Sequence, residues 1–203
     1  PRRGDFGKVL ASADLILQPS QLALEHDTNA FKIPEDKMRV VPGAVDTERF
    51  DPARVLPDGR RRMNVPADAF VVGIVARMQT HRRYEDFWQA MGRLAEAHPQ
   101  VHVIVIGRGT KQDRVAFEPV RALGLTERVH FTGYLDGEDY VGMLKAFDVK
   151  VFLVPGSDGT CRAVREALAM GKPVVAADRG MLREIVDHGE TGYIFDGTAG
   201  ALH

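Results

Sequence analysis

The sequence predicts an α/β fold with a Rossmann-like, doubly wound parallel sheet. First, short apolar runs that suit buried strands alternate with segments of helical spacing from residue 70 onward. Second, six such runs fall between residues 70 and 195, and strands joined through helices form right-handed crossovers in a parallel sheet. Third, 44% hydrophobic and 27% charged residues are ordinary for a globular protein. Ligands bind such sheets at the carboxyl ends of the strands, so the loops there are where function is sought.

The elements follow one another regularly along this part of the chain. Residues 70–75 form an uninterrupted apolar run, and residues 101–106 carry β-branched side chains at five of six positions. Residues 84–97 have the spacing of an amphipathic helix, and a helix over residues 162–170 is closed by Gly171. The remaining predicted strands are residues 129–131, 149–154, 173–177 and 193–195, and the remaining helices are residues 113–123, 138–147 and 181–186.

The first 50 residues do not show this regular alternation of strands and helices. Residues 9–18 and 38–41 suit strands and residues 21–30 suit a helix, but the segment is too small to supply a core of its own. Residues 43–52 have the composition of a linker. We therefore divide the chain into a remnant of a preceding domain (1–42), an interdomain linker (43–52) and the Rossmann-like domain (53–203), which we expect to be truncated at its C-terminus.

Composition and charge narrow the function classes. A net charge of −1 offers no electrostatic case for binding nucleic acid. The single cysteine excludes an internal disulfide and fits a reducing compartment, so we expect a cytoplasmic protein. The longest apolar runs are far too short to span a bilayer.

The loop before the helix of residues 162–170 carries the strongest chemical signal. Small residues lead from a strand into a helix N-terminus, where backbone N–H groups and the helix dipole favour an anion. Asp158 lies eight residues before Glu166, so both acids could face a polyhydroxylated ligand, and a carboxylate that accepts two hydroxyls suits a ribose. The structural alternative is a helix capped by Asp158 or Thr160 with a surface pair between Arg162 and Glu166.

Two more loops follow strand ends. Arg77 ends one strand and Arg82 lies near the next helix N-terminus, where cations are disfavoured unless an anionic ligand is present. Guanidinium groups bind phosphate oxygens in pairs. The loop with Gly133 and Tyr134 is as well explained by an ordinary turn as by contact with a base. The glycines of residues 107–109 suggest a dinucleotide fingerprint, but Gln112 stands where its third glycine belongs, which argues against a dehydrogenase.

Taken together, these segments resemble glycosyltransferase family 4, a retaining family with the GT-B fold. Residues 37–50 are similar to the family's interdomain segment, and Arg77 to Arg82 match its R-x4-K pair with arginine in the lysine position. Asp158 to Glu166 match its E-x7-E motif with aspartate as the first acid. Residues 174–178 and 184–193 match its usual C-terminal run.

The resemblance implies roles for individual residues. Arg77 and Arg82 would neutralise the donor diphosphate, and with Asp158 they would form the catalytic set. Glu166 would bind the ribose hydroxyls, and Gly133 and Tyr134 would lie beside the base. The remaining donor-binding residues would face the sugar and phosphates around Asp158: Gly159, Thr160, Cys161 and Arg162. No metal and no other cofactor would be needed.

The resemblance also implies a function. The chain would be the donor-binding domain of a hexosyltransferase-type enzyme that transfers a sugar from a nucleotide sugar, such as a UDP- or GDP-sugar, with retention. The acceptor, a glycan or a lipid-linked molecule, would bind through an N-terminal domain, so these residues alone would be inactive. The full protein could then be peripheral at the inner face of the membrane. The alternatives are a non-catalytic nucleotide-binding module and a GT-B sugar-nucleotide epimerase.

Overall fold

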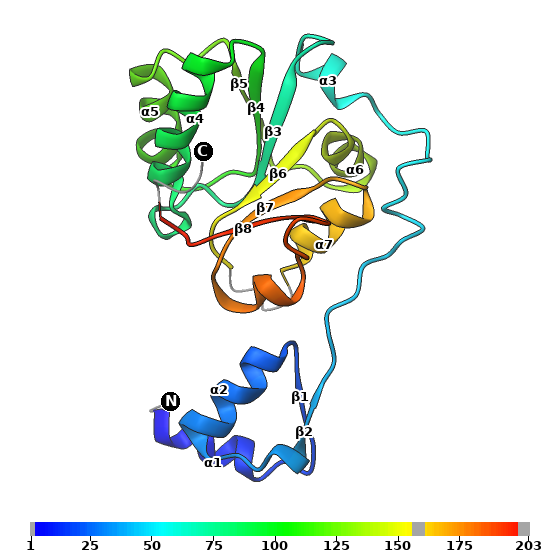
Figure 1. Cartoon of the computed structure of the whole chain (residues 1–203), viewed down its shortest axis with the longest axis vertical. Helices are drawn as coiled ribbons and strands as arrows, with labels where there is room; N and C mark the ends of the chain where they lie inside the picture. The colour runs from blue at the N-terminus through cyan, green and yellow to red at the C-terminus, as the bar shows by residue number, and fades with distance from the viewer. Residues whose placement is uncertain (1–2, 156–160, 199–203) are drawn as a thin grey trace.

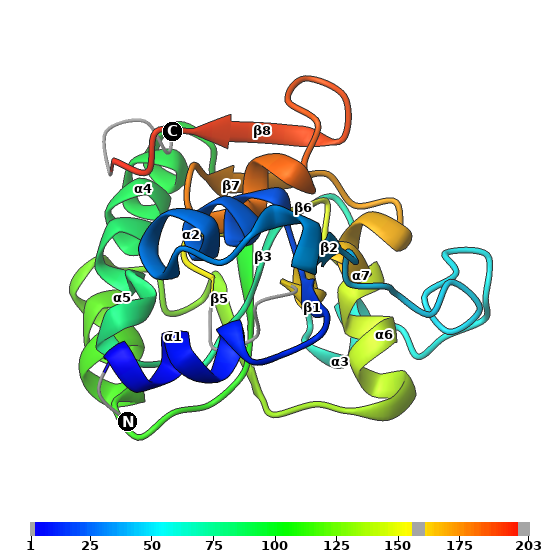
Figure 2. The ribbon, with the colours of Figure 1, turned by 90° about the horizontal axis from the view of Figure 1, so that it is seen from below.

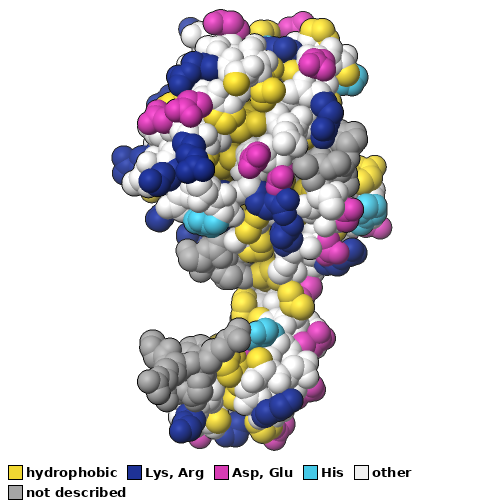
Figure 3. All heavy atoms as spheres, turned by 90° about the vertical axis from the view of Figure 1, so that its left-hand side faces the viewer, with side chains coloured by type: hydrophobic (Ala, Val, Ile, Leu, Met, Phe, Trp, Pro, Cys, Tyr) yellow, Lys and Arg dark blue, Asp and Glu magenta, His cyan; other side chains and the backbone are white. Residues whose placement is uncertain are grey.

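The computed structural model describes residues 3–155 and 161–198. A small N-terminal unit lies below a larger α/β domain, and an extended segment after β2 joins them (Figure 1). In space-filling form the two parts are separated by a narrow waist (Figure 3). Within the described residues, no helix is both long enough and apolar enough to cross a membrane.

The larger domain contains the predicted doubly wound sheet. In the described residues this sheet has six strands, in the order β5-β4-β3-β6-β7-β8, and every neighbouring pair is parallel. The sheet order reverses between β3 and β6, which places a crevice above the carboxyl ends of these strands. The fold class is therefore confirmed. The strands are β3 (Phe70–Val75), β4 (Val101–Ile106), β5 (Val129–Gly133), β6 (Val149–Phe152), β7 (Val174–Ala177) and β8 (Gly192–Phe195).

Helices cover both faces of the sheet. Seen from below, α4 and α5 lie on one side and α6 and α7 on the other (Figure 2). The 14-residue α4 is the longest of these helices. The helical elements of this domain are α3 (Gly59–Arg62), η2 (Thr80–Arg82), α4 (Tyr84–Ala97), η3 (Asp113–Phe117), α5 (Glu118–Ala122), α6 (Gly137–Lys145), α7 (Arg162–Ala169) and η4 (Gly180–Glu184).

Strand alternation divides the core into two layers. Val72 and Ile74 of β3 pack against the α4 side, together with Trp88. Val71 of the same strand packs against the α6 side, together with Phe147. Gly73 of β3 has no side chain, and a Cβ at this position would lie 2.1 Å from the Phe147 ring. The glycine lets this ring pack directly on the strand.

The N-terminal unit contains α1 (Arg3–Ala11), β1 (Ile16–Gln18), α2 (Gln21–Phe31), η1 (Glu35–Lys37) and β2 (Met38–Val40). The two strands pair in parallel, and the unit buries a small cluster of its own, Ile16, Leu24, Ile33 and Met38. The unit contacts the larger domain where Glu184 of η4 accepts hydrogen bonds from the backbone N–H groups of Gln21 (2.8 Å) and Leu22 (2.9 Å). The carboxylate thereby satisfies two donors at the start of α2.

Two predicted elements differ from the structure. The predicted strand of residues 9–18 is right only for its last three residues, because α1 continues to Ala11 and the strand begins only at Ile16. Leu10 packs on the small cluster while Val9 is 67% exposed, as the faces of a helix require. The predicted helix of residues 181–186 is instead the 3₁₀ segment Gly180–Glu184, which begins one residue earlier and ends two residues earlier.

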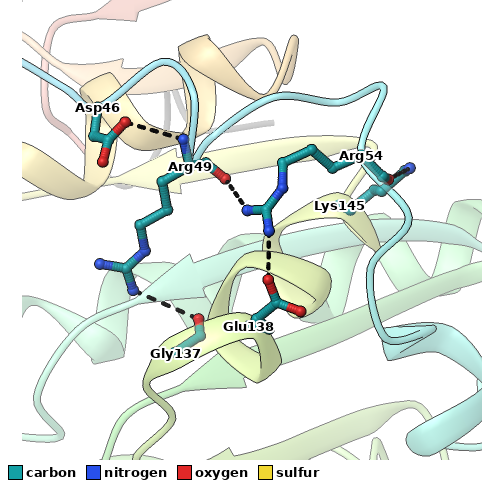
Figure 4. A network of polar contacts seen from close by, with 6 residues as sticks. All are labelled: Asp46, Arg49, Arg54, Gly137, Glu138 and Lys145. Atoms are coloured by element: carbon teal, nitrogen blue, oxygen red, sulfur yellow. Dashed lines mark hydrogen bonds and ion pairs between the residues drawn. The ribbon is translucent and has the colours of Figure 1, made fainter.

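Polar contacts fasten the predicted linker to α6 (Figure 4). The Asp46 carboxylate accepts a hydrogen bond from the Arg49 backbone N–H at 3.0 Å, and the Arg49 guanidinium donates to the Gly137 carbonyl at 3.5 Å. Arg54 donates to the Arg49 carbonyl at 2.9 Å and forms an ion pair with Glu138. These contacts hold Arg49 beside the start of α6.

Two stacked histidines predict a pH-dependent stability. His102 Nδ1 lies 3.0 Å from His130 Nε2, and the rings are nearly parallel. Burial lowers the pKa of both imidazoles, and Arg128 lowers that of His102 further. Neutral histidines are thus favoured in the folded state, so their stabilising contribution is present above about pH 6.5 and is lost as the pH falls below it.

We expect the free energy of unfolding to fall between about pH 7.5 and pH 5. The double variant His102→Gln/His130→Gln should show a smaller fall in urea titrations at these two pH values. The exposed His98 provides the matched control, since His98→Gln should leave the pH dependence unchanged. Equal slopes in the wild type and the double variant would contradict the assignment.

Candidate functional site

A cleft of about 940 Å³ opens at the carboxyl ends of the strands. Its walls come from the segments that follow β3, β4 and β5, from α6, and from the start of α7. Arg49 of the linker completes one side. The cleft therefore lies where the doubly wound fold predicts a ligand.

Four of the predicted site residues line this cleft: Arg77, Tyr134, Arg162 and Glu166. They come from three different loops and helices, and the fold brings them together across about 90 residues of sequence. Arg77 follows the end of β3 and is exposed, as Arg162 is at the start of α7.

Other predicted residues lie beside the cleft. Arg82 is half-buried, its guanidinium lies 3.4 Å from the Val154 carbonyl, and its buried Nε has no hydrogen-bond partner within the described residues. Gly133 ends β5 in a left-handed conformation, and its carbonyl accepts a hydrogen bond from Gly107. Buried Cys161 is the N-cap of α7, in place of the alternative caps Asp158 and Thr160. Asp158, Gly159 and Thr160 lie outside the described residues.

The charge of the cleft favours an anion. Among the described residues that line it are four arginines (Arg49, Arg77, Arg108 and Arg162) and two acids (Asp136 and Glu166). Several guanidinium groups around one cleft suit a polyanion such as a diphosphate, because each can bind two oxygens and none can lose its charge. Within the described residues, no group of three histidine, cysteine or acidic side chains could hold a metal ion. The expected independence from metal stays a prediction.

The two acids differ in their surroundings. Glu166 accepts a hydrogen bond of 2.5 Å from the Tyr140 hydroxyl, and both residues line the cleft. Burial, together with the Glu166 charge and this hydrogen bond, raises the pKa of Tyr140 well above its usual range, so the phenol stays a donor. Asp136 is exposed. Glu166 is thus the oriented acceptor of the cleft.

The glycine loop after β4 also lines the cleft, although the sequence did not predict it as part of the site. Gly107 and Gly109 line the cleft although the dinucleotide fingerprint is broken. A Cβ at Gly107 would lie 2.2 Å from the Ala76 carbonyl oxygen, and one at Gly109 would lie 2.2 Å from that of Met78. The glycines therefore let this loop pack against the loop after β3. The two glycines directly after a strand are the sequence feature that could have marked this loop as a place of close backbone approach.

Three further residues of the site were not predicted. Arg108, between the two glycines, lies with its guanidinium carbon 5.7 Å from the centre of the Tyr134 ring. This pair offers a flat surface on one wall of the cleft, against which a planar base could stack. Arg49 and Tyr140 come from the linker and from α6, and neither lies in a loop directly after a strand of the sheet.

Comparisons with known proteins agree with this geometry. Residues 57–202 match the sequence profile of a family described as glycosyl transferases group 1. D-inositol 3-phosphate glycosyltransferase of Corynebacterium jeikeium is 29% identical over 199 residues, which is 94% of this chain and 47% of that protein. The enzyme of the same name from Stackebrandtia nassauensis is 30% identical over 94% of this chain and 44% of its own length. The chain thus spans about half the length of the curated relatives it matches.

Solved structures show the same fold. The Anabaena protein HepE in complex with UDP superposes with a TM-score of 0.76 at 28% identity, over 90% of this chain and 50% of that one. HepE was also solved in complex with UDP-glucose, with a TM-score of 0.77 at 27% identity over 93% of this chain and 51% of that one. A glycosyltransferase from Rickettsia africae, at 22% identity and a TM-score of 0.82, covers 100% of this chain and 55% of that one, and supports the fold alone.

Proposed function

Because this chain belongs to the glycosyl transferases group 1 family, we propose that its cleft binds the nucleotide sugar donor of a glycosyl transfer reaction. The single observation that carries this proposal is the convergence of four arginines and the oriented Glu166 carboxylate on one cleft at the carboxyl ends of the strands. The arginines suit a diphosphate, and the carboxylate suits the two hydroxyls of a ribose. The similarity to HepE, which was solved with UDP and UDP-glucose, supports a donor of this class.

The proposed roles follow the positions of the side chains. Arg77 binds the diphosphate and stabilises the negative charge that grows on it as the glycosidic bond to the sugar breaks. Arg82 approaches from beside Val154, and Glu166 accepts the ribose hydroxyls. The base lies near Tyr134 and Arg108. Asp158 and the backbone of residues 159–161 remain the proposed contacts of the transferred sugar.

The finer chemistry is also part of the proposal. We place the enzyme in family 4, with retention of the anomeric configuration, transfer of a hexosyl group and no metal. The acceptor is a glycan or a lipid-linked molecule. The curated relatives carry inositol 3-phosphate in their names, which adds a phosphorylated polyol as an acceptor to test. Since the chain covers less than half of those relatives, we expect the 203 residues to bind the donor without transferring the sugar.

Calorimetric titration with UDP, GDP and ADP tests this function. We expect one of the three to bind with a dissociation constant below about 1 mM, without added metal. Uridine, guanosine or adenosine is the matched control, and it should bind much more weakly because it lacks the diphosphate that the arginines hold. No binding of any nucleoside diphosphate at millimolar concentration would overturn the proposal. Product analysis with donor alone separates a transferase from an epimerase.

A further inference from the structure

Lys150 is a fully buried lysine in the middle of β6. Its side chain has no exposed surface, and its Nζ has no hydrogen-bond partner within the described residues. Val151, next along the strand, packs against the α4 side, whereas Phe152 packs with α7. Since successive side chains of a strand alternate, Lys150 shares the α7 side with Phe152, and its Nζ lies 5.8 Å from the centre of that ring.

A buried ammonium in such a position needs a counter-charge. Moving an unpaired charge out of water is costly, and a strand buried on both faces usually carries apolar residues. Burial lowers the pKa of Lys150 to about 7, and the negative charge of Glu166 acts in the opposite direction. Among the described residues, Glu166 is the acid whose charge favours the protonated lysine, and it lies on α7, the helix on the same side of the sheet.

Glu166 is held from a second direction. The Tyr140 hydroxyl of α6 donates to its Oε2 at 2.5 Å. Tyr140 and Glu166 face the cleft, but Lys150 does not line it. The lysine charge thus attracts the carboxylate from within the protein, and the lysine does not occupy the space of a ligand. Arg162 of α7 and Arg49 of the linker are the other charged groups that act on Tyr140.

We propose that Lys150 is a positioning residue that, together with Tyr140, orients the Glu166 carboxylate toward the ribose hydroxyls of the bound nucleotide and so sets a preference for ribonucleotides over deoxyribonucleotides. The inference rests on the proposed donor binding and adds its determinant of sugar specificity. A carboxylate has about four acceptor positions. The Tyr140 hydroxyl occupies one acceptor position of Glu166, and the lysine charge attracts the carboxylate toward the protein interior. The acceptor positions that face the cleft are then free for the ribose hydroxyls. Lys150 itself touches no ligand.

The test compares the affinity for UDP and 2′-deoxy-UDP, or for the GDP or ADP pair if one of these is the stronger ligand. The wild type should prefer the ribonucleotide by about tenfold, as expected for a hydrogen bond to a charged acceptor. Lys150→Met, which keeps the volume and removes the charge, should reduce this preference to less than about threefold. Tyr140→Phe should reduce it in the same direction.

Lys172→Met is the matched control. Lys172 is partly buried, whereas Lys150 is fully buried, and burial is the main cause that lowers the pKa of both lysines. The charged neighbours of Lys172 are Asp148, Arg60 and Lys145. It should keep the full preference. If Lys150→Met binds nucleotides and keeps the tenfold preference, the positioning role is wrong. If the wild type binds no nucleoside diphosphate, the proposed function fails and the inference fails with it.

The pH dependence of the ribonucleotide preference tests the role of the lysine charge in the wild type, without any variant. Between about pH 6 and pH 9 Lys150 loses its proton, so the preference for the ribonucleotide should decrease as the pH rises. The ratio of the two affinities cancels the titration of the phosphates, which both ligands share. A ratio that stays constant over this range would overturn the role of the lysine charge, even if Lys150→Met failed to fold.

Discussion

Replacing Arg77 by alanine is expected to weaken nucleoside diphosphate binding by about a hundredfold, or ~2.7 kcal/mol. Arg77 lines the cleft at the carboxyl end of β3, where a guanidinium can bind two phosphate oxygens. Because the side chain is exposed, its removal should leave the fold intact. The loss should therefore appear in the affinity for the nucleoside diphosphate, with no change in stability.

Control variants and a control ligand distinguish the loss of phosphate contacts from a general loss of nucleotide binding. Arg77→Lys keeps the charge but loses the fork geometry, so its affinity should fall between those of the wild type and Arg77→Ala. Arg121→Ala removes an exposed arginine from α5 and should bind normally. The affinity for the nucleoside without phosphates should change little in Arg77→Ala. An unchanged affinity for the diphosphate would remove Arg77 from the proposed site.

Trp88→Ala is expected to cost about 3–5 kcal/mol of the free energy of unfolding. Trp88 is 1% exposed and contacts the rings of Tyr84, Phe87 and Phe131 in the layer between α4 and the sheet. Its indole N–H donates to the Val115 carbonyl at 2.8 Å, and this part-buried acceptor would lose the indole as a donor. Domains of this size have a total stability of about 5–15 kcal/mol, so the variant should lie close to unfolding.

Urea titration followed by circular dichroism checks this loss, because Trp88 is the single tryptophan and fluorescence would lose its probe. Trp88→Phe keeps the ring contacts but loses the donor, so it should cost about 1–3 kcal/mol. Phe70, which is 44% exposed at the start of β3, provides the control for removing an aromatic ring. A cost for Trp88→Ala no larger than that for Phe70→Ala would contradict the packing described above.

The sequence predicted the sheet well because strand and helix periods are local properties. Five of six residues in the run 101–106 are β-branched, and all six are buried in β4. The same local reading failed at residues 9–18, where Val9 and Leu10 look like a strand but end a helix. A short apolar run has no period of its own, so tertiary packing decides its conformation.

For the site, local patterns identified the residues that follow strand ends. Arg77, Tyr134, Arg162 and Glu166 were predicted in this way, and all four line the cleft. Their functional roles remain predictions. The glycine loop at 107–109 was not predicted as part of the site, because its glycines do not have the spacing of a dinucleotide fingerprint. Their role is geometric: they let this loop pack against the loop after β3.

The sequence by itself therefore determined the fold class, the order of the strands along the chain, and the segments after β3 and β5 and at the start of α7 that line the cleft. Only the tertiary structure decided what surrounds Glu166. Its hydroxyl donor, Tyr140, lies 26 residues away on another helix, and its counter-charge, Lys150, is hidden in a strand of apolar neighbours. Helix and strand periods follow from neighbouring residues, whereas contacts between layers depend on how the layers pack. The buried lysine charge on the same side of the sheet as Glu166 could be identified only once β6, α6 and α7 were in place.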